Sequence, residues 1–468
     1  MFINSAGLNK ELSRITSLAK MDKKVPGILF DIKPKDDKVE IYYQSSGKAI
    51  KTSVEAYFTD DEKQSEKAIS GKIIFDYKRL TDIISYCQSS GNIKVDNVEM
   101  TFTENLTGPG TCVITAVKKV DIVRGDETES RVAANYVQEL SWWKVENATV
   151  QQKILSRDCC EDMFNDIGAA SIDCDELCRM FKDCLAGDAK QVYLAPKFNG
   201  AFACNTNSTV FTPYLAGGDN KIGKAMSVTS NLAKAIVEVF SGEPGDLYVN
   251  DFRDEAGKTT AFIVFNEAKT ISIYVSAAPV NPANVSTLDK YHQMMYGTHQ
   301  ITVMTEVLND VLKASMNLGS GESVDLKFNR DSEDPTRVKG LVLATNTGTS
   351  VNNSYELVCE QYRTLNEISA EEAANNLEVV KMNANVKNIF DIVNKHKGQY
   401  MALDFQTIEN STFMRIGFLD NEVGEEAVKN YLTEYEKSAE DITVEDFINL
   451  RPKTFVACYY VAVSRSSK

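Results

Sequence analysis

The sequence predicts an α+β protein made of three repeated domains, each composed of two similar halves. The first observation is that a strand-like run, a few polar residues and an amphipathic helix follow one another six times within the 468 residues. The second is that each helix is followed by further strand-like runs, so that the copies pair off into three long segments. A large internal repeat determines the architecture before any individual residue does.

The six copies follow the same order of elements. Their strand-like runs and helices are expected at residues 2–4 and 8–15, 72–75 and 78–84, 170–172 and 175–181, 225–228 and 232–237, 300–303 and 306–312, and 379–382 and 386–393. In the first helix Leu8, Leu12 and Ile15 recur at spacings of four and three. This apolar stripe is typical of the face that a helix turns toward a core.

Domain boundaries are expected where this repeated order of strands and helices is interrupted. We expect domain one at residues 1–125, a connector at 126–169, domain two at 170–285 and domain three at 298–468, with an acidic insertion at about 420–451. Residues 281–284, which include Pro282, are interpreted as a linker. The connector holds both tryptophans, Trp142 and Trp143, which could form a binding patch. We favour the interpretation that they anchor the connector to a domain.

Composition excludes several classes of protein. The net charge of −15 argues against a DNA-binding protein that reads sequence, because such domains are usually basic, but it allows a local basic surface. No stretch of ~18 apolar residues predicts a membrane span. The first residues lack a secretory signal, so we expect the ten cysteines to be reduced thiols. The expected location is a cytosol, bacterial or of an infected host cell.

No catalytic or metal-binding constellation is predicted. His292, His299 and His396 are the only histidines, and none lies in a recognisable nucleophile motif. Cys174 and Cys178 have a helical spacing of four, whereas zinc sites usually need four close ligands. We favour packed thiols over a metal site and expect no cofactor. A hydrolase remains only as a residual alternative.

Every predicted helix carries at least one outward basic residue. Each one alone is most simply a solvated charge, but together they would line a basic tunnel if all six outer faces turned toward one axis. The residues that would line this tunnel are Lys10, Arg14, Lys20, Arg79, Arg179, Lys182, Lys234, Lys313, Lys387 and Lys395.

The order and repetition of these elements resemble the DNA polymerase sliding clamp in its bacterial three-domain (beta) form. The likeness covers nearly the whole chain apart from residues 121–169 and 420–451, and is closest in residues 8–29, 71–84 and 459–465. It implies a DNA clamp fold with two helices inside and two antiparallel sheets outside each domain. Six domains would close a ring, so two copies would form a head-to-tail homodimer. Such a ring encircles duplex DNA and tethers the polymerase without catalysis, so the resemblance implies that the basic residues of the tunnel face DNA.

The resemblance also implies a pocket between domains two and three for short peptides of the polymerase and the clamp loader. The candidate walls are Cys204, Thr209, Phe211, Tyr460, Val461 and Val463. The loop at 202–211 lacks the family's His-Arg-Leu pattern, and the closing strand has Val461-Ala462-Val463 where the family has Met-Pro-Met. These departures suggest a virus-encoded clamp with its own partners.

The joint between copies is expected at the edge strand 112–117, which contains Val113, together with Met316 and Leu318. Two alternatives stay open. One is a processivity subunit with the clamp fold that forms no ring and would have a mass near the 52.0 kDa of one chain. The other is a scaffold protein of repeated α+β domains, which predicts no basic helix face.

Overall fold

The structure is a computed structural model of the whole chain. It describes residues 1–23, 27–59, 71–105, 108–124, 127–145, 168–187, 189–204, 208–215, 222–293, 299–317, 324–330, 338–346, 352–358, 361–364, 379–382, 386–396, 400–408, 411–419, 429, 433, 438 and 455–465. The chain divides into two compact units, one of residues 1–175 with 235–277 and one of residues 176–234 with 278–468. The second repeat contributes residues to both.

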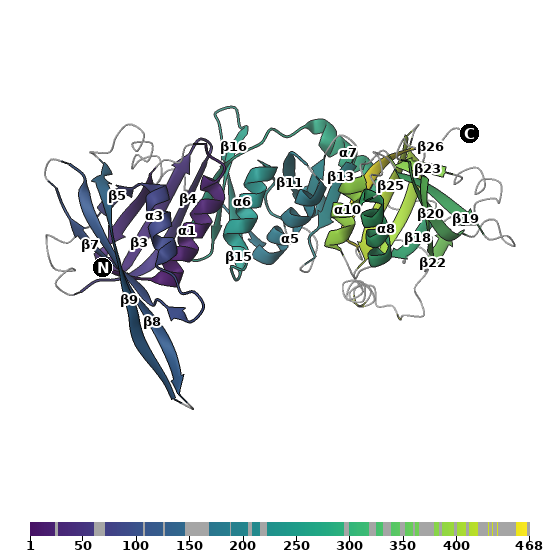
Figure 1. Cartoon of the computed structure of the whole chain (residues 1–468). Helices are drawn as coiled ribbons and strands as arrows, with labels where there is room; N and C mark the ends of the chain where they lie inside the picture. Colours follow the sequence, from purple (N-terminus) through teal and green to yellow (C-terminus); the bar gives the residue numbers. More distant parts are fainter. Residues whose placement is uncertain are drawn as a thin grey trace. The chain divides into compact units, whose positions relative to one another are not determined.

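All six predicted pairs of strand and helix are present (Figure 1). They are β1 (Phe2–Asn4) with α1 (Ser5–Ala19), β5 (Gly71–Phe75) with α3 (Tyr77–Tyr86), β10 (Ala170–Asp173) with α5 (Cys174–Cys184), β14 (Met226–Thr229) with α6 (Ser230–Phe240), β18 (His299–Met304) with α8 (Thr305–Asn317), and β23 (Val379–Met382) with α10 (Val386–Lys395).

A polar residue between strand and helix starts the two helices of the first repeat. The Asn4 side chain accepts a hydrogen bond from the Gly7 amide at 2.9 Å, and the Asp76 side chain accepts one from the Arg79 amide at 2.8 Å. Such a side chain satisfies an amide that has no partner inside the helix. Asn4 and Asp76 are therefore helix caps.

The strands of the first repeat form a closed path of antiparallel pairs. They are β1, β7 (Asn97–Thr103), β8 (Gly110–Arg124), β9 (Glu127–Lys144), β5, β2 (Ile28–Lys33), β3 (Lys38–Ser45) and β4 (Lys48–Tyr57), with the short β6 (Ile93–Lys94) beside β8. The path closes because β1 pairs with both β7 and β4. Leu8, Leu12 and Ile15 are at most 3% exposed, as the apolar stripe of the first helix predicted.

The same unit continues from the first repeat into strands of the second. Strand β4 pairs with β17 (Ile271–Ser276), which is followed in the sheet by β16 (Thr259–Asn266), β15 (Asp246–Arg253) and β10. We call this pairing of β4 with β17 the first junction. It makes one continuous sheet across the boundary between two repeats.

The other unit contains the rest of the second repeat and the third repeat. Its strands are β11 (Gln191–Ala195), β12 (Gly200–Cys204), β13 (Ser208–Pro213), β14, β18, β19 (Val324–Arg330), β20 (Val338–Asn346), β21 (Asn352–Val358), β22 (Gln361–Thr364), β23, β24 (Tyr400–Ile408), β25 (Ser411–Leu419) and β26 (Phe455–Arg465). Strand β13 pairs with β26, and we call this pairing the second junction.

Two parts of the predicted domain division need correction. Residues 127–144, predicted as part of a connector, form β9, which pairs with β8 along its length and with β5 at its end. Trp142 is 2% exposed, so it does anchor this segment to the first repeat. The predicted linker at 281–284 starts helix α7 (Pro282–Gln293), because Asn281 accepts a hydrogen bond from the Ala283 amide at 3.0 Å. The acidic insertion lies almost entirely outside the described residues.

Among the described residues, no helix is long and apolar enough to cross a membrane.

Candidate functional site

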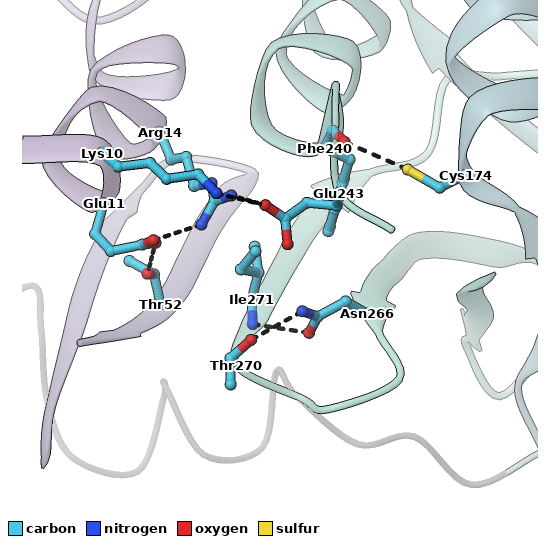
Figure 2. A network of polar contacts seen from close by, with 10 residues as sticks. All are labelled: Lys10, Glu11, Arg14, Thr52, Cys174, Phe240, Glu243, Asn266, Thr270 and Ile271. Carbon is cyan, nitrogen blue, oxygen red and sulfur yellow. Dashed lines mark hydrogen bonds and ion pairs between the residues drawn. The ribbon is translucent and has the colours of Figure 1, made fainter. Parts of the chain in front are cut away.

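The basic residues of α1 point to acidic side chains of the second repeat (Figure 2). Lys10 Nζ lies 3.0 Å from Glu243 Oε1, and Arg14 also binds that carboxylate. Lys20, directly after the helix, pairs with Glu238 of α6 at 2.5 Å. These three predicted DNA-facing residues therefore reinforce the first junction.

Arg14 is buried, contrary to the prediction that it faces DNA. It is 6% exposed and its guanidinium also lies 2.5 Å from Glu11, whose carboxylate accepts a hydrogen bond from Thr52 of β4. The helical spacing places Arg14 opposite the apolar stripe, but that side of α1 meets another repeat and not solvent. A single helix cannot reveal such a neighbour.

The remaining basic residues differ in their surroundings. Arg79, Lys182, Lys234 and Lys313 are exposed on their helices. Arg179 is held by Glu176 at 2.9 Å and by Asp183 at 3.5 Å. Lys395 donates a hydrogen bond to the backbone carbonyl of Lys182. The side chain of Lys387 lies outside the described residues.

Asp183 lies at the second junction in a charged but buried setting. It is 9% exposed, and its backbone carbonyl accepts a hydrogen bond from the Tyr459 hydroxyl of β26 at 3.3 Å. Burial raises the pKa of the Asp183 carboxyl to about 6, although the nearby charges of Arg179 and Lys395 act to lower it. This carboxyl therefore changes charge close to neutral pH.

Three of the predicted pocket residues come together in one apolar cluster. Phe211 and Tyr460 are buried there with Tyr193, Phe202, Leu288 and Cys458, and Cys204 packs against them. Thr209 donates a hydrogen bond to Cys204 Sγ at 3.3 Å. Val461 and Val463 lie in β26, but their side chains are outside the described residues.

The prediction missed helix α7 as a wall of this cluster. Leu288 is 0% exposed among the cluster's aromatic rings, Val285 packs beside it, and Lys197 pairs with Asp289 at 2.5 Å. The signal was present in the sequence, since proline after asparagine is typical of a helix start as well as of a linker. The accessible members of the cluster are the half-buried Ala195, Phe198, Cys204 and Val285.

The predicted joint strand is not an edge. Val113 of β8 lies between Thr101 of β7 and Glu139 of β9, so both sides of the strand are already paired. Met316 is half-buried in α8, and Leu318 is outside the described residues. Strand β9, which the prediction placed in the connector, pairs with β5 through residues 142–144 and otherwise only with β8 among the described residues.

The three cysteines of α5 are packed thiols. Cys174, Cys178 and Cys184 are at most 3% exposed, and burial raises the pKa of the Cys184 thiol. Within the described part of the chain, no group of three or more His, Cys, Asp or Glu residues could hold a metal ion.

Comparison with known proteins identifies the fold. No protein-family model and no curated protein sequence matches the chain. Among solved structures, it is similar to the DNA polymerase III beta subunit of Thermotoga maritima, with a TM-score of 0.58, 11% identity and coverage of 100% of this chain and 99% of that one. The DNA polymerase sliding clamp of Bacillus subtilis matches with a TM-score of 0.59, 9% identity and the same coverage.

A third match is a sliding clamp of Pseudomonas aeruginosa bound to griselimycin, with a TM-score of 0.61, 9% identity and coverage of 100% of this chain and 99% of that one. The likeness extends over the whole length of all three chains. The protein therefore has the fold of the sliding clamps, and the predicted α+β clamp architecture is confirmed.

Proposed function

We propose that this protein is a sliding clamp, a processivity factor that encircles duplex DNA and tethers a DNA polymerase without catalysing a reaction. The observation that supports this proposal most strongly is the match to solved clamp subunits, which covers 100% of this chain at 9–11% identity. A fold hosts many functions, so the chain's own residues must supply further support.

The exposed basic residues supply part of that support. Arg79, Lys182, Lys234 and Lys313 come from four helices that occupy repeated positions in the chain. In a protein with a net charge of −15, such residues would give weak contacts with phosphates and no base readout. Encirclement would then keep the protein on DNA while leaving it free to slide.

Two copies would complete the ring as a head-to-tail homodimer, since three repeats per chain make six in the pair. The proposed location of the protein is a cytosol, bacterial or of an infected host. A particle that sediments as one chain at all concentrations would support the alternative of a clamp-fold subunit without a ring.

The test of encirclement is whether the protein is retained on linear DNA whose ends are blocked. Linear duplex is fixed to beads at one end and blocked at the other by a bulky protein, and the clamp is loaded with its cognate loader. Retention in high salt should last while the block is present and end when a nuclease frees the end. Equal retention on blocked and open DNA would contradict the clamp function, because only a topological link depends on the ends.

The apolar cluster beside α7 is the proposed docking surface for a short peptide of the polymerase or loader. The cluster joins α7, β13 and β26, and its half-buried members can still contact a partner. Apolar anchors of an extended peptide would pack there, with a few contacts carrying most of the affinity. The altered loop at 202–211 implies a peptide specific to this protein's own partners.

Phe211 is a poor first target because it is only 6% exposed and supports the fold. Val285→Asp alters a half-buried member and should reduce capture of the cognate polymerase by about tenfold or more. Val280→Asp, at a valine that is 54% exposed and outside the cluster, is the matched control. Undiminished capture of the polymerase by Val285→Asp would show that the docking surface lies elsewhere on the protein.

A further inference from the structure

The first and second repeats carry the same turn at the same place in their sheets. In the first repeat, the turn Pro34–Asp36 joins β2 to β3 and ends at Asp37, whose φ is 48°. In the second repeat, the turn Pro196–Phe198 joins β11 to β12 and ends at Asn199, whose φ is 46°. Aspartate and asparagine adopt this left-handed conformation more readily than most residues. The two turns therefore align the repeats residue by residue.

The side chains at aligned positions differ in chemistry. In the second repeat, a row of cross-strand partners belongs to the apolar cluster and consists of Tyr193, Phe202 and Phe211. In the first repeat, the aligned row of cross-strand partners consists of Asp31, Glu40 and Ser53. The same place in the sheet is thus aromatic in one repeat and polar in the other.

Glu40 gathers three lysines around one buried carboxylate. Its side chain is 7% exposed and lies 2.6 Å from Lys33, 3.2 Å from Lys38 and 3.6 Å from Lys51, and we call these three residues the lysine cluster. Tyr42 also donates a hydrogen bond to Glu40 at 2.7 Å. Burial acts to raise the pKa of Glu40, but the hydrogen bonds from Lys33 and Tyr42 lower it to about 2. The carboxylate therefore stays charged and holds the lysines in place.

The lysine cluster can bind a further anionic partner. Its side chains are 24–38% exposed, and together they carry more N–H donors than one carboxylate has acceptor sites. Asp31, 3.8 Å from Lys33, adds a second carboxylate. Lys72 of β5 and Glu55 of β4 extend the same face by one charge of each sign. This face therefore has a surplus of positive charge in a chain whose net charge is −15.

The lysine cluster lies on the face of the sheet that points away from α1. Thr52 of β4 contacts Glu11 of α1, and side chains alternate between the faces of a strand, so Lys51 lies on the other face. Farther along that face of β4, Tyr57 is 57% exposed, and its partner in β1, Phe2, is 37% exposed. An exposed apolar patch rimmed by charged residues is typical of a binding surface.

We propose that this face binds an extended acidic peptide of a partner protein, with carboxylates on the lysine cluster and an apolar anchor on Tyr57 and Phe2. Alternate side chains of an extended peptide share one face, so its carboxylates and its anchor can follow β4 together. The net charge of −15 repels acidic peptides from the rest of the surface. The proposal goes beyond the clamp function, because it adds a second docking surface on the first repeat.

A peptide fits this face better than a single-stranded nucleic acid does. Proteins that bind single strands offer a positively charged groove that follows the backbone. Here the three ammoniums converge on one carboxylate, and Asp31 and Glu55 border them on the same face. A phosphate backbone would meet these acidic groups after a short distance, whereas a few carboxylates of a peptide fit the cluster alone.

The probe is a fluorescein-labelled peptide that alternates glutamate with serine and ends in leucine. Fluorescence anisotropy measures its binding to the full-length chain. The chain should bind this peptide, and added salt should weaken the binding. The same peptide with glutamine in place of glutamate should bind about tenfold or more weakly. Equal binding of the two peptides, or no binding of the acidic one, would overturn the proposal.

A double variant tests the lysine cluster. Lys38→Gln with Lys51→Gln retains Lys33 as a partner of the buried carboxylate and should raise the dissociation constant of the acidic peptide about tenfold or more. The matched control is Lys258→Gln with Lys269→Gln, which changes the net charge equally at exposed turns of the same compact unit. The control should bind as the wild type does. Equal losses in both double variants would overturn the proposal.

Tyr57→Ser tests the apolar anchor without changing the charge. Because Tyr57 is 57% exposed, the variant should keep the melting temperature of the wild type. Its dissociation constant for the peptide that ends in leucine should rise about fivefold, whereas a peptide that ends in serine should bind to both proteins equally. Equal losses with the two peptides would contradict the anchor.

Other occupants of this face would give different results. A single-stranded oligonucleotide that displaces the labelled peptide at a lower concentration than unlabelled peptide does would assign the face to nucleic acid and overturn the proposal. Loss of self-association in the Lys38→Gln, Lys51→Gln variant would assign it to a second copy, with the same consequence. The variant should still be retained on DNA with blocked ends, so failure of this proposal and failure of the clamp function can be told apart.

Discussion

At the scale of single residues, the contrast between Arg14 and Lys10 separates structural from surface charges. Both bind Glu243, yet the Arg14 side chain is 7% exposed and that of Lys10 is 62% exposed. Removing one partner of a buried pair leaves an uncompensated charge, whereas exposed pairs contribute little. Substitutions of Arg14 and of Lys10 can therefore be compared directly, because each removes a partner of the same Glu243 carboxylate.

Arg14→Ala should lower the free energy of unfolding by about 3 kcal/mol, because Glu11 and Glu243 lose their buried partner. Lys10→Ala should lower it by less than about 1 kcal/mol. The measurement is the urea concentration at the midpoint of unfolding of the unit that contains the first junction. Equal effects of the two substitutions would contradict the buried network.

The pKa of Asp183 predicts a pH dependence of stability. The folded chain keeps this proton up to about pH 6, whereas the ordinary pKa is 3.8. Between these values the folded state binds more protons than the unfolded state, so the group's contribution to stability falls as the pH rises and stays low above the window.

Asp183→Asn has a similar shape and no charge, so it should avoid this loss. Its stability relative to wild type should grow between about pH 4 and pH 6, by at most about 3 kcal/mol, and then stay level. Urea unfolding of both proteins across that range measures the difference. A difference independent of pH would mean that Asp183 is charged throughout.

At the scale of elements, β9 depends on one close contact. A side-chain carbon at Gly110 would lie 2.2 Å from the Trp142 ring, so only glycine leaves room for the tryptophan that anchors β9. Gly110→Ala should therefore destabilise the first repeat by about 1–3 kcal/mol through overpacking. Gly108→Ala, where the added carbon meets only Asn105 at 3.5 Å, is the control. Thermal unfolding measures both variants. Equal melting temperatures for the two would contradict the close contact of Gly110 with the Trp142 ring.

The repeated strand and helix pairs were predictable because their signals are local. Apolar periodicity predicted all six helices, and the caps Asn4 and Asp76 directly precede the helices that they start. Strand β9 was missed because its exposed stretch around Val132 and Val137 looks like a polar connector, and its partners lie elsewhere in the chain. Likewise, the burial of Arg14 depends on Glu243, more than two hundred residues away. Both features depend on contacts between segments that are distant in the sequence, and apolar periodicity does not report such contacts.

At the scale of the whole molecule, charge and topology make different predictions about binding to DNA. Replacing Arg79, Lys234 and Lys313 with Ala removes three positive charges from exposed helix positions, so −15 becomes −18. Under the clamp function, DNA association should weaken by the same factor for every sequence, and its salt dependence should become shallower.

The control replaces Lys35, Lys258 and Lys269, which are exposed in turns between strands, and it changes the net charge equally. Loading onto DNA circles of different sequence, followed over a range of salt, measures both effects. Equal losses in the two triple variants would show that total charge, and not the helix positions, governs association.

The first and second junctions use opposite charges at the same place in the repeat, and this has a consequence for how the chain folds. Arg14 and Asp183 both lie nine residues after the start of their helices, yet one is a cation facing Glu243 and the other an acid near Lys395. A nascent chain with three similar repeats risks pairing them in the wrong order. The two junctions are therefore chemically different at the same helix position, which disfavours the exchange of one junction for the other.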